Sequence, residues 1–378
     1  MTTPRIIDIH TPIAQAVQRL YDATTTAVLT TKTDPKNNIA YVQGILTEKD
    51  YMTKLHHGSY APTDITTEQI MTKQLDIATL ETKVLYSLSI LVQHGRRHLP
   101  VLTKEGFDAL SQGNKALSSS LSLLLTSSTP LPVSYLYLLT MKELIGYLIE
   151  QIYNEQIMNG KPTEELKQGI SIPSLSSTET SSKITNTTSN THSTPSSPST
   201  SSPNSLTINN NTVIPLQWYH RTGDVLLALK ALNRKPILLN THIQDKVTVA
   251  DAANIMAEKN MSALAIIDNK QRMAGMFTSR DFLNRVVSKG NNATLLPVQD
   301  VMTKDIISAS PDASVLRVAR AMVKRGVRHI PISEADGTVL GILSLSDIAR
   351  VLTGQLLYPL QQSTPTLDTK ISNNIGIQ

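Results

Sequence analysis

The sequence predicts an α/β (α+β) fold in which one small unit, ordered strand–helix–strand–strand–helix, occurs four times and is arranged as two pairs. Two observations lead to this prediction. Three short motifs return in the second half of the chain at one constant offset of 231 residues. Between the halves, residues 171–212 contain 24 Ser or Thr among 42 positions and only two charged residues, which is typical of a linker.

The recurring motifs keep their order as well as their spacing. The pairs are GILTEKD with GMFTSRD (ending at Asp50 and Asp281), IMTK with VMTK (ending at Lys73 and Lys304) and RHLPV with RHIPI (starting at Arg97 and Arg328). Three motifs in one register over more than 50 residues are not expected by chance. The two halves of the chain are therefore expected to share one topology.

The last unit shows its elements most clearly. An amphipathic run that begins near Pro311 predicts a helix. Two runs rich in β-branched residues, 328–332 and 339–343, predict strands on either side of an Asp-Gly turn. A second helix is expected to begin at Ser344, and a short strand at 306–309 is expected to lead into the unit.

The other three units follow the same order. Residues 247–287 predict helices at 249–258 and 281–287 and strands at 263–267 and 273–277, and residues 11–55 and 75–153 follow the same scheme. In the second unit, the signature threonine Thr140 lies 43 residues after the start of the RH motif, against 16 residues in the fourth unit. We interpret the roughly 27 additional residues as a surface loop insertion at about 103–134.

These patterns divide the chain into six segments. They are a first unit at 1–58, a second at 66–155, a disordered Ser/Thr-rich linker at 165–212, a third unit at 222–290, a fourth at 297–358 and a flexible tail at 360–378. The linker is expected to be disordered because it cannot bury enough apolar surface to offset the entropy lost on ordering it.

Composition excludes several classes of site. The chain has no cysteine, which rules out disulfides, thiolate zinc sites and thiol nucleophiles. The nine histidines show no metal-ligand spacing, and the P-loop, GxGxxG and GxSxG patterns are all missing. We therefore expect no metal, no required cofactor and no catalytic activity.

Charge and hydropathy limit the possible partners. A net charge of +5 over 378 residues is too mild an excess for a nucleic-acid-binding face, although anionic small ligands remain compatible with it. The N-terminus lacks the features of a signal peptide, and the most apolar stretch, 116–149, is broken by prolines and charges. We expect no nucleic-acid partner, no membrane span and a cytoplasmic location.

Four such units, three of them with a Gly-h-h-Ser/Thr-x-x-Asp junction (h, hydrophobic), resemble the cystathionine-β-synthase (CBS) domain family. Residues 301–351 carry the resemblance most fully and 248–287 nearly as well, and a pair of units resembles the CBS pair, or Bateman module, of small stand-alone proteins. The resemblance implies that each pair packs its sheets about a pseudo-twofold axis and encloses two clefts. It also implies that these clefts bind adenosine nucleotides (AMP, ADP, ATP or S-adenosylmethionine) and that the modules regulate enzymes or transporters.

Each Ser/Thr-x-x-Asp junction places a carboxylate three residues after a hydroxyl at a helix start. The pairs are Thr47 with Asp50, Thr278 with Asp281, and Ser344 with Asp347. The carboxylate can accept hydrogen bonds from two ribose hydroxyls, and the hydroxyl can contact a phosphate near the free N–H groups of the helix. The same spacing also forms a capping box, in which both side chains only satisfy backbone donors, so both interpretations stay open.

Basic residues of the RH motif complete the candidate site. Arg97, Arg328 and His329 enter strands beside the expected clefts. The family resemblance implies phosphate contacts at these positions, with Arg328 favoured, and arginine can hold a phosphate through two N–H groups. The alternative is a solvated arginine and a histidine that caps or packs.

One junction departs from the pattern. Thr140 is followed by Glu143 instead of an aspartate, and Tyr137 stands where the other junctions have glycine. Because Glu is the usual partner in a capping box, we interpret this junction as structural and expect one degraded cleft in the N-terminal half.

The function that the sequence favours is regulation. The protein is expected to bind adenosine nucleotides as regulatory ligands in the clefts between units and to modulate a partner protein. The expected protein partner is a second copy of the chain or another protein, joined by stacking of CBS pairs. The alternative is a ligand-free scaffold for protein interaction or oligomerisation, in which the signatures survive only as helix caps.

Overall fold

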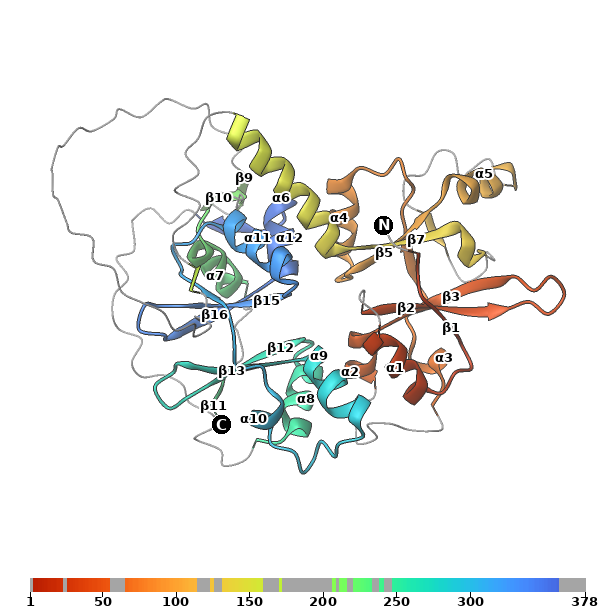
Figure 1. Ribbon diagram of the computed structural model, residues 1–378. Coiled ribbons are helices and arrows are strands. Elements are labelled where there is room, and N and C mark those ends of the chain that lie inside the picture. The colour runs from red at the N-terminus through yellow and green to blue at the C-terminus, as the bar shows by residue number, and fades with distance from the viewer. Residues whose placement is uncertain are drawn as a thin grey trace, which may run out of the picture.

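In the computed structural model, four small α+β units surround a common centre (Figure 1). The structure describes residues 3–22, 26–54, 65–113, 123–125, 131–158, 170–171, 206–208, 211–215, 220–232, 238–240 and 247–359. Most of the predicted linker 165–212 and all of the predicted tail 360–378 lie outside the described residues. Within the linker, the short strands β8 (Ile170–Ser171) and β9 (Leu206–Ile208) are described.

The first unit has the predicted order of elements. They are β1 (Ile6–Asp8), α1 (Ile13–Asp22), β2 (Ala27–Thr33), β3 (Ala40–Thr47) and α2 (Glu48–Lys54). Strands β1 and β2 are parallel, whereas β2 and β3 are antiparallel. Helix α1 is therefore the crossover between the parallel strands, and α2 begins directly after β3, where the signature lies.

The second unit repeats this order and carries the insertion. Its elements are α3 (Thr67–Ile70), β4 (Leu75–Ile77), α4 (Val84–Gln93), β5 (His98–Leu102), β7 (Leu136–Thr140) and α6 (Met141–Met158), with α5 (Lys104–Gly113), β6 (Leu123–Leu125) and the 3₁₀ turn η2 (Val133–Tyr135) between β5 and β7. The prediction of a plain surface loop at 103–134 is corrected here. Strand β6 pairs with β4, and Leu110 of α5 packs against the hydrophobic core.

The C-terminal half has the same topology. The third unit consists of β11 (Leu238–Asn240), α8 (Val249–Glu258), β12 (Ala263–Ile267), β13 (Met273–Thr278), α9 (Ser279–Asp281), the π-helical turn η3 (Phe282–Val286) and the 3₁₀ turn η4 (Val287–Lys289). The fourth consists of α10 (Val298–Val301), β14 (Ser308–Ala309), α11 (Val315–Arg325), β15 (His329–Ser333), β16 (Val339–Ser344) and α12 (Leu345–Leu352). In both, a parallel strand pair is followed by an antiparallel one, as in the first unit.

Helix α7 (Thr222–Ala231) lies in the segment that we assigned to the third unit, 222–290, but packs with the fourth. Val225 and Ala228 are buried in the core that contains the fourth unit. The Thr222 hydroxyl donates to the carbonyl of Ser310 at 2.8 Å. Two further strands, β10 (Asn211–Pro215) and β17 (Leu357–Pro359), pair with each other beside it, so chain order does not follow spatial packing here.

Three clusters of buried hydrophobic residues hold the units together. One cluster combines the second and fourth units, one combines the first and third, and one lies between the sheets of the first and second. Helices α4 and α6 pack on α12, α6 also packs on α11, and α2 packs on α8 and α9. The N-terminal module (first and second units) is thus joined to the C-terminal module (third and fourth units) through two helical interfaces. In the described part of the chain, no helix combines the length and apolarity needed to span a membrane.

One close contact explains two of the recurring motifs. The backbone groups of Ile45 and Thr72 exchange hydrogen bonds at 3.0 and 2.9 Å, and those of Met276 and Thr303 do so at 2.8 Å in both directions. A Cβ on Gly44, one residue before Ile45, would lie only 2.5 Å from the carbonyl oxygen of Thr72. The signature glycine therefore lets the last strand of one unit lie against the MTK motif that starts the next.

Candidate ligand-binding site

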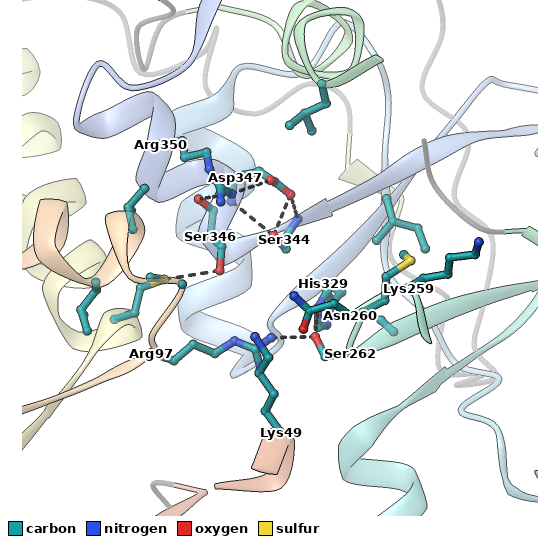
Figure 2. Close-up of a pocket in the computed structure, with 18 residues that line it drawn as sticks. Lys49, Arg97, Lys259, Asn260, Ser262, His329, Ser344, Ser346, Asp347 and Arg350 are labelled. Carbon is teal, nitrogen blue, oxygen red and sulfur yellow. Dashed lines mark hydrogen bonds and ion pairs between the residues drawn. The ribbon is translucent and has the colours of Figure 1, made fainter. Parts of the chain in front are cut away.

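A cavity of about 660 Å³ lies between the third and fourth units and reaches the N-terminal module (Figure 2); we call it the large cavity. Its volume is in the range of small-molecule sites. Ser344, Asp347 and Arg350 lie at one end, and Lys49 and Arg97 lie at the other. Apolar side chains on the walls are Leu91, Val92, Met141, Leu229, Met261 and Ile342.

The signature at this cavity forms a complete helix cap. The backbone N–H and the hydroxyl of Ser344 donate to Oδ2 of Asp347 at 3.0 and 2.6 Å, and the Asp347 N–H donates to the serine hydroxyl at 3.2 Å. Oδ1 of Asp347 accepts from Arg350 Nη1 at 3.2 Å. The capping interpretation is therefore confirmed at this position. The carboxylate nevertheless lines the cavity, and its oxygens have lone pairs for further donors.

The first signature forms the same cap at a second cavity, of about 350 Å³, which we call the N-terminal cavity. The Thr47 hydroxyl donates to Oδ2 of Asp50 at 2.6 Å. Oδ1 of Asp50 accepts from the Thr72 hydroxyl at 2.6 Å and from Lys54 Nζ at 3.0 Å. Both carboxylate oxygens are thus already engaged within the protein.

The third signature repeats this arrangement of hydrogen bonds. The Thr278 hydroxyl donates to Oδ2 of Asp281 at 2.6 Å, the Thr303 hydroxyl donates to Oδ1 at 3.0 Å, and Arg285 lies 3.4 Å from Oδ1. Thr278 and Asp281 line none of the three cavities described here. The structure therefore gathers only part of the predicted set, namely Ser344, Asp347, His329 and Arg97 in the large cavity and Thr47, Asp50, Arg97 and Arg328 in the N-terminal cavity.

The junction that departs from the signature pattern borders a third cavity, of only about 60 Å³, which we call the small cavity. Thr140 and Glu143 form a capping box, with the Thr140 N–H and hydroxyl each 2.8 Å from Oε2 of Glu143. The expectation of one degraded cleft in the N-terminal half stays a prediction. Further along, helix α6 packs closely on α11, and a Cβ on Gly146 would lie 3.1 Å from Val323 Cγ1.

The first residues of the two RH motifs, Arg97 and Arg328, lie close together at the centre of the molecule. They belong to a group that we call the central charge cluster, made of Glu48, Lys49, Arg97, Arg280 and Arg328. The three arginines act on the single carboxylate of Glu48, and Lys49 lies near Arg97 and Asp50. Arg328 donates through Nη2 to Oε2 of Glu48 and through Nη1 to the Thr26 hydroxyl, the latter at 3.2 Å. Arg280 Nε lies 3.7 Å from Glu48 Oε1.

Arg97 has different partners from Arg328. Its Nη2 donates to the Ser262 hydroxyl at 2.7 Å, and that hydroxyl lies 3.1 Å from Nε2 of His329. No carboxylate of the described residues lies within ion-pair distance of Arg97. The Arg97 guanidinium therefore lines the large cavity without a direct ion pair among the described residues, and Glu48 attracts it only at longer range.

The pKa values in the cluster reflect this excess of positive charge. Burial would raise the pKa of Glu48, but Arg328, Arg280 and Arg97 together hold it below its usual value. Burial and the repulsion from Arg328 lower the pKa of Arg97 to about 10. Burial, followed by the charges of Arg97, Arg328 and Arg280, holds the pKa of His329 well below 6.5, so this imidazole is neutral at physiological pH. An anion in the large cavity would relieve this field.

Sequence reasoning missed Glu48, Lys49 and Ser262 of this site, whereas Arg280 is recognisable in the sequence as a residue of the third signature that could reach a phosphate. Glu48, Lys49 and Arg280 occupy the two variable positions of a Ser/Thr-x-x-Asp signature, and Ser262 directly precedes β12. The variable positions face the centre because the two flanking residues are turned back into the helix cap. That geometry could have indicated Glu48 and Lys49, whereas the sequence pattern contains no signal for Ser262.

Comparison with known proteins decides the family. The model of the CBS domain matches residues 230–288 and 298–354. An uncharacterised 17.7 kDa protein of Acidianus ambivalens is 32% identical over 128 residues, which cover 34% of this chain and 75% of that protein. The chain belongs to the CBS domain family. A mitochondrial CBS domain-containing protein of Arabidopsis thaliana, CBSX3, is 31% identical over 119 residues, which cover 30% of this chain and 57% of that protein.

The whole arrangement of four CBS units also has a counterpart among solved structures. Protein MJ1225 of Methanocaldococcus jannaschii superposes with a TM-score of 0.54 and covers 91% of this chain and 94% of its own length, at 12% sequence identity. At that identity the likeness concerns the fold alone. It supports an α+β fold in which two CBS pairs form one body.

Proposed function

We propose that this CBS-domain protein is a regulatory protein that binds an adenosine nucleotide (AMP, ADP, ATP or S-adenosylmethionine) in the large cavity and thereby modulates a partner protein. One observation carries the proposal. The cavity of about 660 Å³ is lined by a carboxylate suited to ribose hydroxyls, that of Asp347, and by two cations suited to an anionic group, those of Lys49 and Arg97, neither of which forms a direct ion pair among the described residues.

Each part of a nucleotide finds suitable groups in this cavity. The ribose hydroxyls would donate to the carboxylate of Asp347 at the N-terminus of α12. The apolar walls, which include Leu91, Met141 and Ile342, would accept the adenine ring. The phosphates would approach Arg97 and Lys49, where charge-assisted hydrogen bonds are strongest.

The composition of the cavity walls supports a regulatory role. Ser344 and Asp347 belong to the C-terminal module, whereas Lys49 and Arg97 belong to the N-terminal module. A ligand that contacts both modules binds best to one of their relative arrangements, and it shifts the protein toward that arrangement. The change would be passed to a partner that contacts both modules.

One observation favours the scaffold alternative for part of the molecule. Both carboxylate oxygens of Asp50 and Asp281 are already bonded to threonine hydroxyls and lie beside basic side chains. At Asp347, by contrast, Oδ2 accepts a hydroxyl hydrogen bond from Ser344, and Oδ1 accepts from Arg350. We therefore assign Asp50 and Asp281 a capping role and restrict the nucleotide proposal to the large cavity.

Titration calorimetry of the full chain with AMP, ATP and S-adenosylmethionine tests the proposal. We expect dissociation constants between micromolar and millimolar, about 4 to 8 kcal/mol of binding free energy. Asp347→Asn should weaken nucleotide binding at least about tenfold, because a charge-assisted hydrogen bond contributes roughly 1.5–3 kcal/mol.

Asp251→Asn is the matched control, because Asp251 forms the same capping box at α8 but does not line the large cavity. It should leave nucleotide affinity unchanged. The proposal is refuted if none of the three ligands produces either heat or a thermal shift. Equal effects of the two variants would show that Asp347 acts only as a cap.

A further inference from the structure

The centre of the molecule has a pseudo-twofold arrangement that is broken at one position. Residues 231 positions apart occupy equivalent places, and the pairs are Glu48 with Ser279, Lys49 with Arg280, Arg97 with Arg328, and His98 with His329. Three pairs keep the same charge type, whereas the first replaces a carboxylate by a hydroxyl. The Ser279 hydroxyl donates to Glu48 Oε2 at 3.3 Å, so the axis passes between these two side chains.

Glu48 receives the contacts that a bound anion would receive. Its side chain is only about 6% exposed. It accepts from Nη2 of Arg328, lies 3.7 Å from Arg280 and accepts from the Ser279 hydroxyl. Two guanidinium groups and a hydroxyl around one oxyanion are typical of a phosphate site.

The equivalent guanidinium in the other half has no such partner. Arg97 donates to the neutral Ser262 hydroxyl and lines the large cavity. Arg328 donates to the hydroxyl at the equivalent place, Thr26, but also to Glu48. The two halves therefore present the same donors, and only the half with Arg97 leaves them to an external anion.

The space beside Arg280 agrees with this difference. Of the three cavities Arg280 lines only the small one, whose volume of about 60 Å³ is an eleventh of that of the large cavity, whereas Arg328 also lines the N-terminal cavity, where Glu48 lies beside it. Such a volume holds about four water molecules. It is therefore large enough for an inorganic anion and too small for a nucleoside.

We propose that Glu48 is a built-in anion that occupies, in the Arg328 half of the centre, the role that a ligand phosphate takes in the Arg97 half. It neutralises Arg328 and Arg280 permanently and limits the centre to one external anionic group. Glu48 is thus a specificity-determining residue for the number of phosphate groups that the centre accepts. The inference rests on the proposed function, because it assumes that the Arg97 half receives a phosphate.

Calorimetric titration of the full chain with inorganic phosphate tests the inference. Glu48→Gln keeps the shape of the side chain and removes its charge, so this variant should bind one more phosphate per chain than the unmodified protein. Adding Arg328→Gln to the same variant should abolish the additional site. Glu150→Gln is the matched control, because Glu150 pairs with Arg320 between α6 and α11, outside the three cavities, and it should leave the stoichiometry unchanged.

Thermal unfolding in chloride and in phosphate covers the case in which the variant is unstable. Glu48→Gln and Glu48→Ser, the latter restoring the hydroxyl of the other half, should both melt lower in chloride and regain more stability from phosphate than the unmodified protein. The inference is overturned if Glu48→Gln gains no phosphate site. It is also overturned if phosphate stabilises neither variant more than the unmodified protein. If the unmodified protein binds none of the nucleotides but Glu48→Gln still gains a phosphate, the proposed function fails and the role of Glu48 stands.

Discussion

In the aspartates of the three signatures, one carboxylate oxygen has the same hydrogen-bond partners in every case, whereas the partners of the other oxygen differ. In each, Oδ2 accepts the N–H and hydroxyl of the residue three positions earlier. Oδ1 of Asp50 and of Asp281 accepts a threonine hydroxyl from the start of the next unit, whereas Oδ1 of Asp347 accepts from Arg350 on the wall of the large cavity. One local motif thus forms the same helix cap at all three signatures and differs in the partner of its second carboxylate oxygen.

His329 makes the stability of the protein depend on pH. In the unfolded chain its pKa is about 6.5, and in the folded protein burial and the nearby arginines hold its pKa well below that value. Between the two values the unfolded state binds more protons, so the free energy of unfolding falls as the pH is lowered through 6.5 toward the folded pKa. Glu48, whose pKa is also lowered, adds a loss in the same direction below about pH 4.5.

We expect His329→Asn to flatten the pH dependence of stability between about pH 7 and pH 5.5. The slope that one histidine contributes is at most about 1.4 kcal/mol per pH unit, and the asparagine cannot take up the proton. Urea unfolding at several pH values measures it. A slope that is the same with and without the histidine would show that His329 does not titrate in this range.

At the scale of elements, the signature glycines are expected to differ in importance. At Gly44 an added Cβ would meet the backbone oxygen of Thr72 at 2.5 Å, whereas at Gly275 it would meet the sulfur of the Met302 side chain. A methionine side chain can change rotamer, but the backbone of Thr72 is held by two hydrogen bonds to Ile45.

Gly44→Ala should therefore destabilise the protein by about 1–3 kcal/mol, the usual cost of overpacking, and Gly275→Ala should cost less. Urea unfolding of the two variants provides the comparison. Gly95→Ala gives a reference for backbone strain alone, because Gly95 has a φ of +62° and a Cβ added there would have no neighbour within 4 Å. Equal losses at Gly44 and Gly275 would contradict the explanation from the contacted atom.

The sequence predicted those features that depend on neighbouring residues. The helix caps at Thr47, Thr278 and Ser344 follow from a three-residue spacing, and the repeated order of elements follows from local patterns. The packing of α7 on the fourth unit and the bond between Glu48 and Arg328 join segments that are distant in sequence. They depend on how whole units dock, and no local pattern encodes that.

At the scale of the whole molecule, the hydrophobic cores do not follow the order of the units in the chain. One core is shared by the second and fourth units, and another by the first and third. Arg320 of α11 also pairs with Glu150 of α6 and lies 3.8 Å from the centre of the Tyr153 ring. Each CBS unit is therefore stabilised by a unit of the other module.

We expect loss of a core side chain in one module to loosen the opposite module. Ile348 of α12 is fully buried in the core shared by the second and fourth units. Ile348→Ala should lower the free energy of unfolding by about 2–5 kcal/mol. It should also reduce the hydrogen-exchange protection of α4 and α6, which belong to the N-terminal module and are distant from Ile348 in sequence.

Ile266→Ala provides the matched variant, because Ile266 of β12 is equally buried in the core shared by the first and third units. Its effect on exchange should fall on α1 and α2 and spare α4. Protection lost only within the third and fourth units in both variants would mean that the modules are stable independently. Coupling between the modules would then depend on the ligand's own contacts with both of them and not on these cores.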